Sequence, residues 1–98
     1  MIKHIVFWKL KDEALGNTRQ QNAQQLKERL EALRGQVDGM KHLEVGVNFN
    51  PNGFDLCLYS EFDSKQALEA YQSYPPHVEI KGFVAEITTD RAVADYEY

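Results

Sequence analysis

The segment from Tyr71 to Val78 carries the residue types best suited to chemistry, because a histidine follows two consecutive prolines. The helical region is disfavoured for the residue before a proline, so Pro75 and Pro76 predict an extended kink between two helices. Pro76 is suited to begin the second helix, which puts His77 in its first turn. The helix dipole disfavours a charged imidazole there, so we expect His77 to be neutral and able to accept a proton. Tyr71 precedes it by about one helical turn and the kink, and is the candidate hydrogen-bond donor.

Structural roles remain open for both residues. His77 could form a local hydrogen bond or meet solvent at the start of its helix. Tyr71 falls on the apolar stripe of the preceding helix with Ala67 and Leu68, so we expect its ring in the core. A buried tyrosine hydroxyl needs a partner, and His77, water or a ligand carbonyl would each serve.

Composition and charge narrow the function classes. The 98 residues include 15 acids and 11 bases, for a net charge of −4, and the bases alternate with acids. This pattern argues against a nucleic-acid partner. No apolar run approaches the roughly 20 residues of a membrane span, and the N-terminus lacks a signal-peptide pattern. The single cysteine, Cys57, excludes an internal disulfide, so we expect a cytoplasmic protein with Cys57 in its core.

Motifs for metals and cofactors are missing from the sequence. It contains no H-x-H, H-x-x-x-H or C-x-x-C pair, no glycine-rich nucleotide loop and no nucleophile elbow. We therefore expect no metal and no cofactor, and we expect His42, at the start of a strand, on the surface. Any chemistry should be proton transfer.

Hydrophobic patterns predict the elements that must position these residues. Residues 2–10 read as a strand that is apolar on both faces. A helix with an apolar stripe follows, capped by Asn17 or Thr18 and stopped by Gly35. Residues 42–49 and 54–62 read as a hairpin around a turn at 50–53, with Phe54, Leu56 and Leu58 expected on one face of the second strand.

The second half predicts two helices and a strand. Asp63 and Ser64 should cap the next helix, with Gln66 at the spacing of a capping box after Asp63. After the proline kink, apolar residues recur at helical spacing up to Ile87, and residues 91–98 read as a last strand. With no linker or repeat, we expect residues 1–98 to form a single domain.

This order predicts an α+β, ferredoxin-like βαββαβ fold, a four-stranded antiparallel sheet with helices on one face. The handedness of crossovers places the third strand between the first and second, and the fourth beside the first. The first and third strands are apolar on both faces, so the uncovered face should meet a partner. We expect a homodimer through sheet-to-sheet packing, which closes a dimeric α+β barrel.

The same topology brings His4 and Asp95 together, because the start of the first strand lies beside the end of the last. The aspartate could orient the imidazole and fix its tautomer. The structural alternative is a buried histidine whose polarity a carboxylate satisfies.

Several segments together make the chain similar to the Dabb family, the stress-responsive α/β-barrel domain. They are residues 3–12, residues 54–62, the tyrosine-to-histidine segment 68–78, and Asp95-Tyr96 near the end. The resemblance covers nearly the whole chain and implies a dimeric α+β barrel. Families of this kind do not imply a single activity.

The family includes plant stress proteins, small bacterial proteins of unknown role, and a plant polyketide cyclase that forms olivetolic acid. The resemblance to the cyclase branch implies that His77 and Tyr71 match its catalytic pair. His4 and Asp95 match two further positions. The chain departs from the family pattern at Tyr74, where a histidine is usual, and at Ile80, where an aromatic residue is usual, so both should alter the pocket wall.

We therefore expect a small homodimeric Dabb protein with a His/Tyr pocket and an undefined activity. Its expected ligand is a small carbonyl compound, bound by His4, Asp95, Tyr74 and Ile80 beside the pair. The alternative is a polyketide cyclase-like enzyme, in which His77 is the general base and Tyr71 donates a hydrogen bond.

Overall fold

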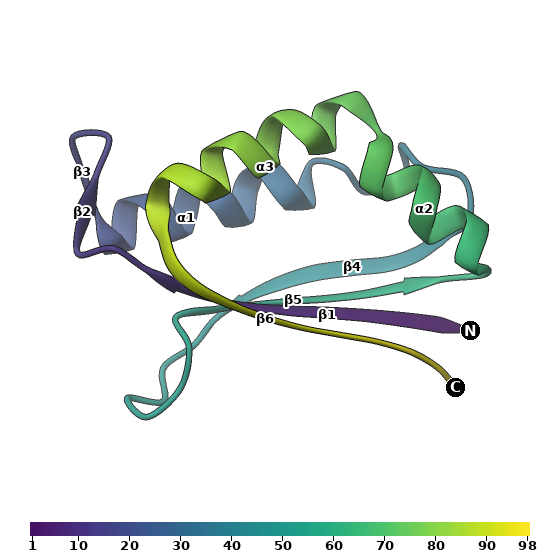
Figure 1. Ribbon diagram of the computed structural model, residues 1–98, viewed down its shortest axis with the longest axis horizontal. Coiled ribbons are helices and arrows are strands. Elements are labelled where there is room, and N and C mark those ends of the chain that lie inside the picture. The colour runs from purple at the N-terminus through teal and green to yellow at the C-terminus, as the bar shows by residue number, and fades with distance from the viewer.

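A four-stranded antiparallel sheet carries all three helices on one face (Figure 1). The computed structural model describes residues 1–98. The sheet order is β4-β5-β1-β6, and all neighbours are antiparallel. The strands are β1 (Ile2–Leu10), β4 (Met40–Val47), β5 (Leu56–Phe62) and β6 (Thr88–Glu97), and the helices are α1 (Arg19–Glu31), α2 (Lys65–Ser73) and α3 (Pro75–Ile87). The predicted ferredoxin-like fold and strand order are confirmed.

A short ribbon between β1 and α1 is the one pair of strands that the sequence did not predict. It pairs β2 (Glu13–Ala14) with β3 (Asn17–Thr18). The two residues between them, Leu15 and Gly16, have φ values of 53° and 77°. Positive φ at both central residues is typical of a tight hairpin turn, which glycine permits at little cost.

The helix starts follow local capping chemistry. Thr18 caps α1 in a capping box: its hydroxyl accepts from the Gln21 amide at 3.2 Å, and its own amide donates to the Gln21 side chain at 2.9 Å. The capping box predicted from Asp63 and Gln66 is wrong. Ser64 alone caps α2, accepting from the Ala67 amide at 3.1 Å, because Asp63 lies one residue outside the cap.

The proline kink forms as predicted, one residue earlier. Tyr74 is extended, with φ −64° and ψ 123°, and α3 begins at Pro75 rather than Pro76. His77 is thus the third residue of α3 and lies in its first turn. The packing near the start of α2 requires a glycine at position 39 (φ +85°). A Cβ there would lie 2.5 Å from the Asp63 carboxylate and 2.6 Å from the Ala67 methyl group. This close approach lets α2 pack down onto the β4 end of the sheet.

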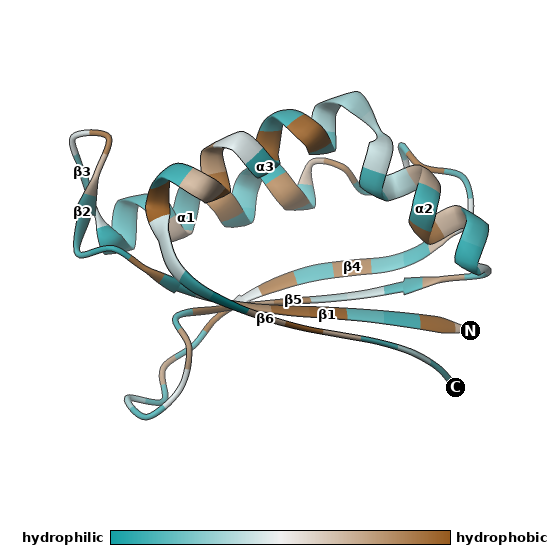
Figure 2. Ribbon diagram, in the orientation of Figure 1, coloured by the Kyte–Doolittle hydropathy of each residue, from teal (hydrophilic) through white to brown (hydrophobic).

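The core lies between the helices and the inner face of the sheet. Inward side chains of the strands, including Val6, Trp8 and Leu58, are buried against Leu26, Leu30 and other apolar residues of the helices. Figure 2 shows apolar residues on β1 and on α3. Each fully buried aliphatic side chain contributes about 1.5–3 kcal/mol through removal from water.

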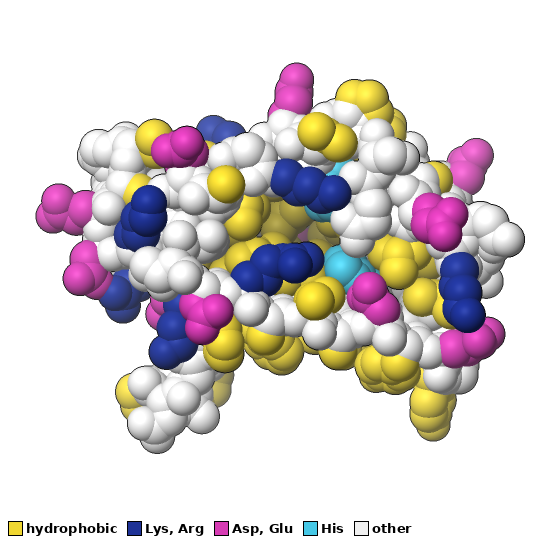
Figure 3. Space-filling model, in the orientation of Figure 1, with side chains coloured by type: hydrophobic (Ala, Val, Ile, Leu, Met, Phe, Trp, Pro, Cys, Tyr) yellow, Lys and Arg dark blue, Asp and Glu magenta, His cyan; other side chains and the backbone are white.

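The outer face of the sheet has no helix over it. Ile5 and Phe7 of β1 lie there beside Cys57 and Tyr59 of β5, and Phe7 is 38% exposed. Apolar side chains also project along the lower edge of the space-filling view (Figure 3). Both central strands therefore have apolar residues on both faces, as the sequence indicated.

Cys57 in β5 and Phe54 just before it lie in positions that differ from the predictions. Cys57 is half-buried on the outer face rather than in the core. Phe54 precedes β5 and packs on the outer-face residue Phe7, with ring centroids 5.9 Å apart, so it does not share a face with Leu56. Side chains alternate between the two faces only within the strand, and Phe54 lies between the turn and the start of β5 at Leu56.

Candidate ligand-binding site

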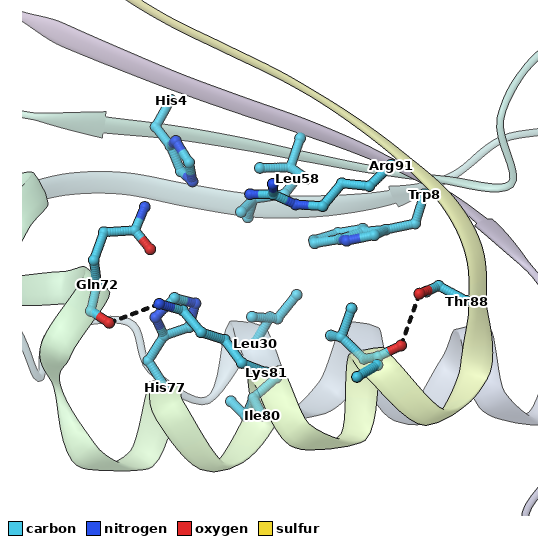
Figure 4. A pocket seen from close by; sticks show the side chains of 13 residues that line it. His4, Trp8, Leu30, Leu58, Gln72, His77, Ile80, Lys81, Thr88 and Arg91 are labelled. Carbon is cyan, nitrogen blue, oxygen red and sulfur yellow. Dashed lines mark hydrogen bonds between the residues drawn. The ribbon is translucent and has the colours of Figure 1, made fainter.

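A cavity of about 390 Å³ lies between α3 and the inner face of the sheet (Figure 3). It forms where the helices stop short of the edge strand β6, so that Val93 stays 48% exposed beside buried Val6. Its volume falls within the range of small-molecule pockets. The lining residues are His4, Val6, Trp8, Leu30, Leu58, Gln72, His77, Ile80, Lys81, Val84, Ala85, Thr88 and Arg91 (Figure 4).

His77 lines this cavity as a buried, neutral imidazole. Its Nδ1 lies 3.0 Å from the Tyr71 carbonyl oxygen, which only accepts, so Nδ1 carries the proton and Nε2 the lone pair. Burial, together with the smaller effect of the positive charge of Lys81, lowers the pKa of His77 to about 4. His77 is therefore an acceptor at neutral pH.

Tyr71 lies behind His77 and does not line the cavity. The two rings are stacked, with centroids 3.9 Å apart and planes inclined by 21°, while the Phe62 ring is 5.3 Å away. The Tyr71 hydroxyl is buried and has no hydrogen-bond partner, and burial raises its pKa above the usual range. His77 thus contacts Tyr71 through its ring and backbone, and the hydroxyl is sealed from the cavity.

His4 and Asp95 are directly paired across β1 and β6, and the predicted contact between them is present. The carboxylate accepts a hydrogen bond from Nδ1 of His4, which fixes that proton on Nδ1. His4 is buried and lines the cavity, whereas the Asp95 side chain is 47% exposed. Asp95 therefore orients a cavity residue without lining the cavity.

The two positions that depart from the family pattern are separated in the structure. Ile80 is buried and forms part of the cavity wall. Tyr74 lies elsewhere, and its hydroxyl donates to the Gln36 side chain at 2.8 Å. Only Ile80 is placed to shape the cavity.

Five polar or aromatic lining residues were not singled out in the sequence as site residues: Trp8, Gln72, Lys81, Thr88 and Arg91. Lys81 had a local signal, since it follows His77 by four residues and so shares its helix face. Arg91 reaches the cavity only because β6 places it opposite Trp8. The Trp8 indole nitrogen is buried without an acceptor.

Within the structure, no group of three His, Cys, Asp or Glu side chains is arranged to hold a metal ion. None of the helices has the length and apolar character needed to cross a membrane.

Several solved protein structures share this fold. A dimeric, ferredoxin-like protein of unknown function from Bacteroides fragilis NCTC 9343 is 36% identical, with a TM-score of 0.87, covering 99% of this chain and 95% of that one. A dimeric ferredoxin-like protein of unknown function from Thermobifida fusca YX is 19% identical, with a TM-score of 0.84 and coverage of 99% and 90%.

A hydroxynitrile lyase from Passiflora edulis is 24% identical, with a TM-score of 0.78, covering 97% of this chain and 90% of that one, and at this identity the likeness shows the fold alone. No curated protein matches the chain. The model of the stress responsive A/B barrel domain matches residues 2–98. The chain therefore belongs to the Dabb family of stress responsive A/B barrel domains.

Proposed function

We propose that this protein binds a small carbonyl compound in the cavity between α3 and the sheet. The observation that supports this most is that two buried histidines from distant elements, His4 and His77, face one cavity with largely apolar walls. Buried polar groups around an apolar hollow are the usual arrangement of a small-molecule site.

The residues that line the cavity include an unused acceptor, Nε2 of His77, and a donor without a partner, the Trp8 N–H. The Trp8 N–H is buried without an acceptor, and an unpaired buried donor costs about 1–3 kcal/mol. The Trp8 indole lines the cavity while its nitrogen is shielded from solvent, so a ligand carbonyl oxygen would recover part of that cost if the indole turned towards it. Nε2 of His77 would accept from an enol hydroxyl or a polarised C–H group.

The proposal includes a homodimer in which the outer sheet faces pack together. Apolar residues without a helix over them support it, and a second hollow of about 590 Å³ lies there, lined partly by Phe7, Phe54 and Cys57. Two of the similar proteins are described as dimeric. Packing of this face leaves the cavity on the opposite face open. The single unpaired Cys57 fits the reducing conditions of the cytoplasm.

The binding proposal can be tested by titrating the protein with butyrophenone, an aryl ketone, and with butylbenzene, which lacks the carbonyl. Calorimetry should show tighter binding of the ketone, and Trp8→Phe should reduce its affinity to that of the hydrocarbon. A Trp8→Phe variant that keeps the full preference for the ketone contradicts the assigned donor. No binding of either compound at millimolar concentration contradicts the function.

The alternative is an enzyme resembling the polyketide cyclase, in which His77 removes a proton next to a carbonyl and Tyr71 donates to the developing enolate. The neutral His77 and its free Nε2 favour it. A base whose pKa is about 4 is weak at neutral pH, and the Tyr71 hydroxyl is sealed from the cavity, so binding is the better-supported function.

Deuterium exchange separates the two functions. The enzyme should accelerate incorporation of deuterium at the carbon next to the butyrophenone carbonyl, followed by proton NMR in D₂O. His77→Ala should abolish this, and His42→Ala should not, because His42 lies on the outer face of the sheet. Equal exchange with and without protein contradicts the enzymatic alternative.

A further inference from the structure

We propose that the ligand of this cavity is an apolar carboxylate, whose anionic group binds at the cavity mouth between Lys81 and Arg91. The inference rests on the proposed ligand-binding function and names the chemical class of its ligand. It concerns two residues that neither the sequence patterns nor the family resemblance singled out.

The two cations approach the mouth from opposite walls. Lys81 comes from α3, and Arg91 comes from β6, where it is paired with Trp8. In Figure 4 the Arg91 guanidinium extends along the sheet towards His4, while the Lys81 side chain lies along α3 beside His77. Figure 3 shows basic side chains on both sides of the hollow, with histidine side chains visible beside them.

Neither cation has an acidic partner. The Lys81 ammonium donates only to the Gln72 carbonyl oxygen, at 2.8 Å, and no ion pair involves Arg91. Five of the 11 bases of this chain do have an acidic partner, among them Lys27 with Glu31 at 3.0 Å and Arg34 with Glu31 at 3.1 Å. The charges at the mouth are therefore available to a ligand.

The cavity has the opposite charge balance to the chain as a whole. The chain carries 15 acids against 11 bases, yet no Asp or Glu is among the lining residues. Asp95 is the acidic residue that contacts a lining residue, and its carboxylate already accepts a hydrogen bond from His4. An anion at the mouth would thus meet two cations without a facing carboxylate.

A carboxylate with an apolar body fits the rest of the wall. A guanidinium binds a carboxylate through two parallel hydrogen bonds, and the ammonium adds a third donor. Beyond the cations and the two histidines most of the wall is apolar, with contributions from Val6, Trp8, Leu58, Ile80 and Val84. A small, highly charged anion would leave this apolar volume unfilled.

The test compares 4-oxo-4-phenylbutanoate with its uncharged methyl ester, since both carry the same aryl ketone. Trp8 is the only tryptophan and lies in the cavity wall, so its fluorescence reports binding directly. The wild-type protein should bind the acid about tenfold more tightly than the ester at low salt, the ratio expected for one partly exposed charge-assisted contact. Raising the salt concentration should reduce the preference.

Matched variants locate the anion site. Lys81→Gln and Arg91→Gln should each remove most of the preference for the acid, and Arg91→Lys should restore part of it. Lys65→Gln changes the net charge equally but lies on α2, exposed and away from the cavity, so it should keep the preference. The three residues are exposed, so the folded state should tolerate all of these changes.

The outcomes separate this inference from the proposed function. An ester that binds as tightly as the acid overturns the inference and leaves carbonyl binding intact. A preference for the acid that survives both Lys81→Gln and Arg91→Gln also overturns it, because the anion then binds elsewhere. If neither compound binds, the proposed function fails and the inference fails with it.

Discussion

The His77 imidazole stacks on the Tyr71 ring, with centroids 3.9 Å apart, and its Nδ1 donates to the Tyr71 carbonyl oxygen at 3.0 Å. The two residues belong to different helices, and the extended Tyr74 between them makes this contact possible. The Tyr71 carbonyl also accepts from the Tyr74 amide at 3.2 Å, but Pro75, four residues after Tyr71, has no N–H to continue the helical ladder there. The kink therefore sets both the position and the tautomer of His77.

The buried His77 should make the protein sensitive to acid. The pKa of His77 is about 4 in the folded state and 6.5 in the unfolded chain. Between these two pH values the imidazole is protonated in the unfolded state and neutral in the folded state. The contribution of the neutral His77 to the free energy of unfolding is fully present above pH 6.5. It falls by roughly 3 kcal/mol in total as the pH drops towards 4. Urea unfolding at pH 7.5 and pH 4.5 measures this loss.

The acid sensitivity has a matched control. The groups facing His77 are Lys81, His4 and Tyr71, so the comparison must leave these unchanged. His77→Gln should flatten the pH dependence over this range, whereas His42→Gln, at an exposed histidine, should not. Equal slopes in the wild-type protein and His77→Gln would contradict the assignment.

Lys81→Gln should raise the pKa of His77. The ammonium is the second cause of the lowered pKa after burial, so its removal should shift the pKa upwards but not back to 6.5. Titration of the His77 ring protons by NMR measures the shift, with Lys65→Gln as the control. A His77 pKa that is the same in both variants speaks against an effect of the Lys81 charge.

Tyr71→Phe should leave the stability unchanged or increase it by up to about 1 kcal/mol. The hydroxyl is buried without a partner, so its removal costs no hydrogen bond. Tyr71→Ala should instead lose about 3–5 kcal/mol, because it empties a fully buried aromatic site. A clear loss of stability in Tyr71→Phe, measured by urea unfolding, would mean that the hydroxyl has a partner.

Asp95→Asn should disturb the tautomer of His4. A carboxylate only accepts, which keeps the proton on Nδ1, whereas an asparagine amide can present either an acceptor or a donor. Nitrogen-15 shifts of the His4 ring should indicate a single Nδ1–H form in the wild-type protein and a mixture in the variant. An unchanged spectrum would show that other contacts fix the tautomer.

Phe7→Glu should break the proposed homodimer, because it places a charge in the apolar outer face of the sheet. Val78→Glu is the matched control, since Val78 is 48% exposed on α3, on the other side of the molecule. Sedimentation at micromolar concentration should give a monomer for Phe7→Glu and a dimer for Val78→Glu and the wild-type protein. A wild-type monomer would exclude the sheet-to-sheet interface.

The helices and the four main strands followed from the sequence because each depends on local signals, and the order of the strands followed from the handedness of crossovers. The strand predicted over residues 2–10 has the same bounds as β1, and the proline pair marked the break between α2 and α3. Cys57 was misplaced within a regular strand, and other predictions failed where the chain leaves regular structure. The β2–β3 ribbon depends on two residues with positive φ, and Phe54 follows a turn that interrupts the alternation of the strand.

The contact between His4 and Asp95 was also accessible from the sequence, because antiparallel neighbours place the start of one strand beside the end of the other. The sequence did not indicate which side chains line the cavity. Arg91 enters it through the register of β6 against Trp8, while Tyr71 is sealed behind His77 and Tyr74 points to Gln36.

The sequence alone thus determined the ferredoxin-like order of elements, the kink before His77 and the apolar outer face, since hydrophobic spacing and proline stereochemistry act over a few residues. Only the tertiary structure decided which side chains share a cavity, and that Lys81 and Arg91 stand at its mouth. That outcome depends on how α3 packs over the sheet and how far β6 extends beyond the helices, which are properties of residues distant in the chain.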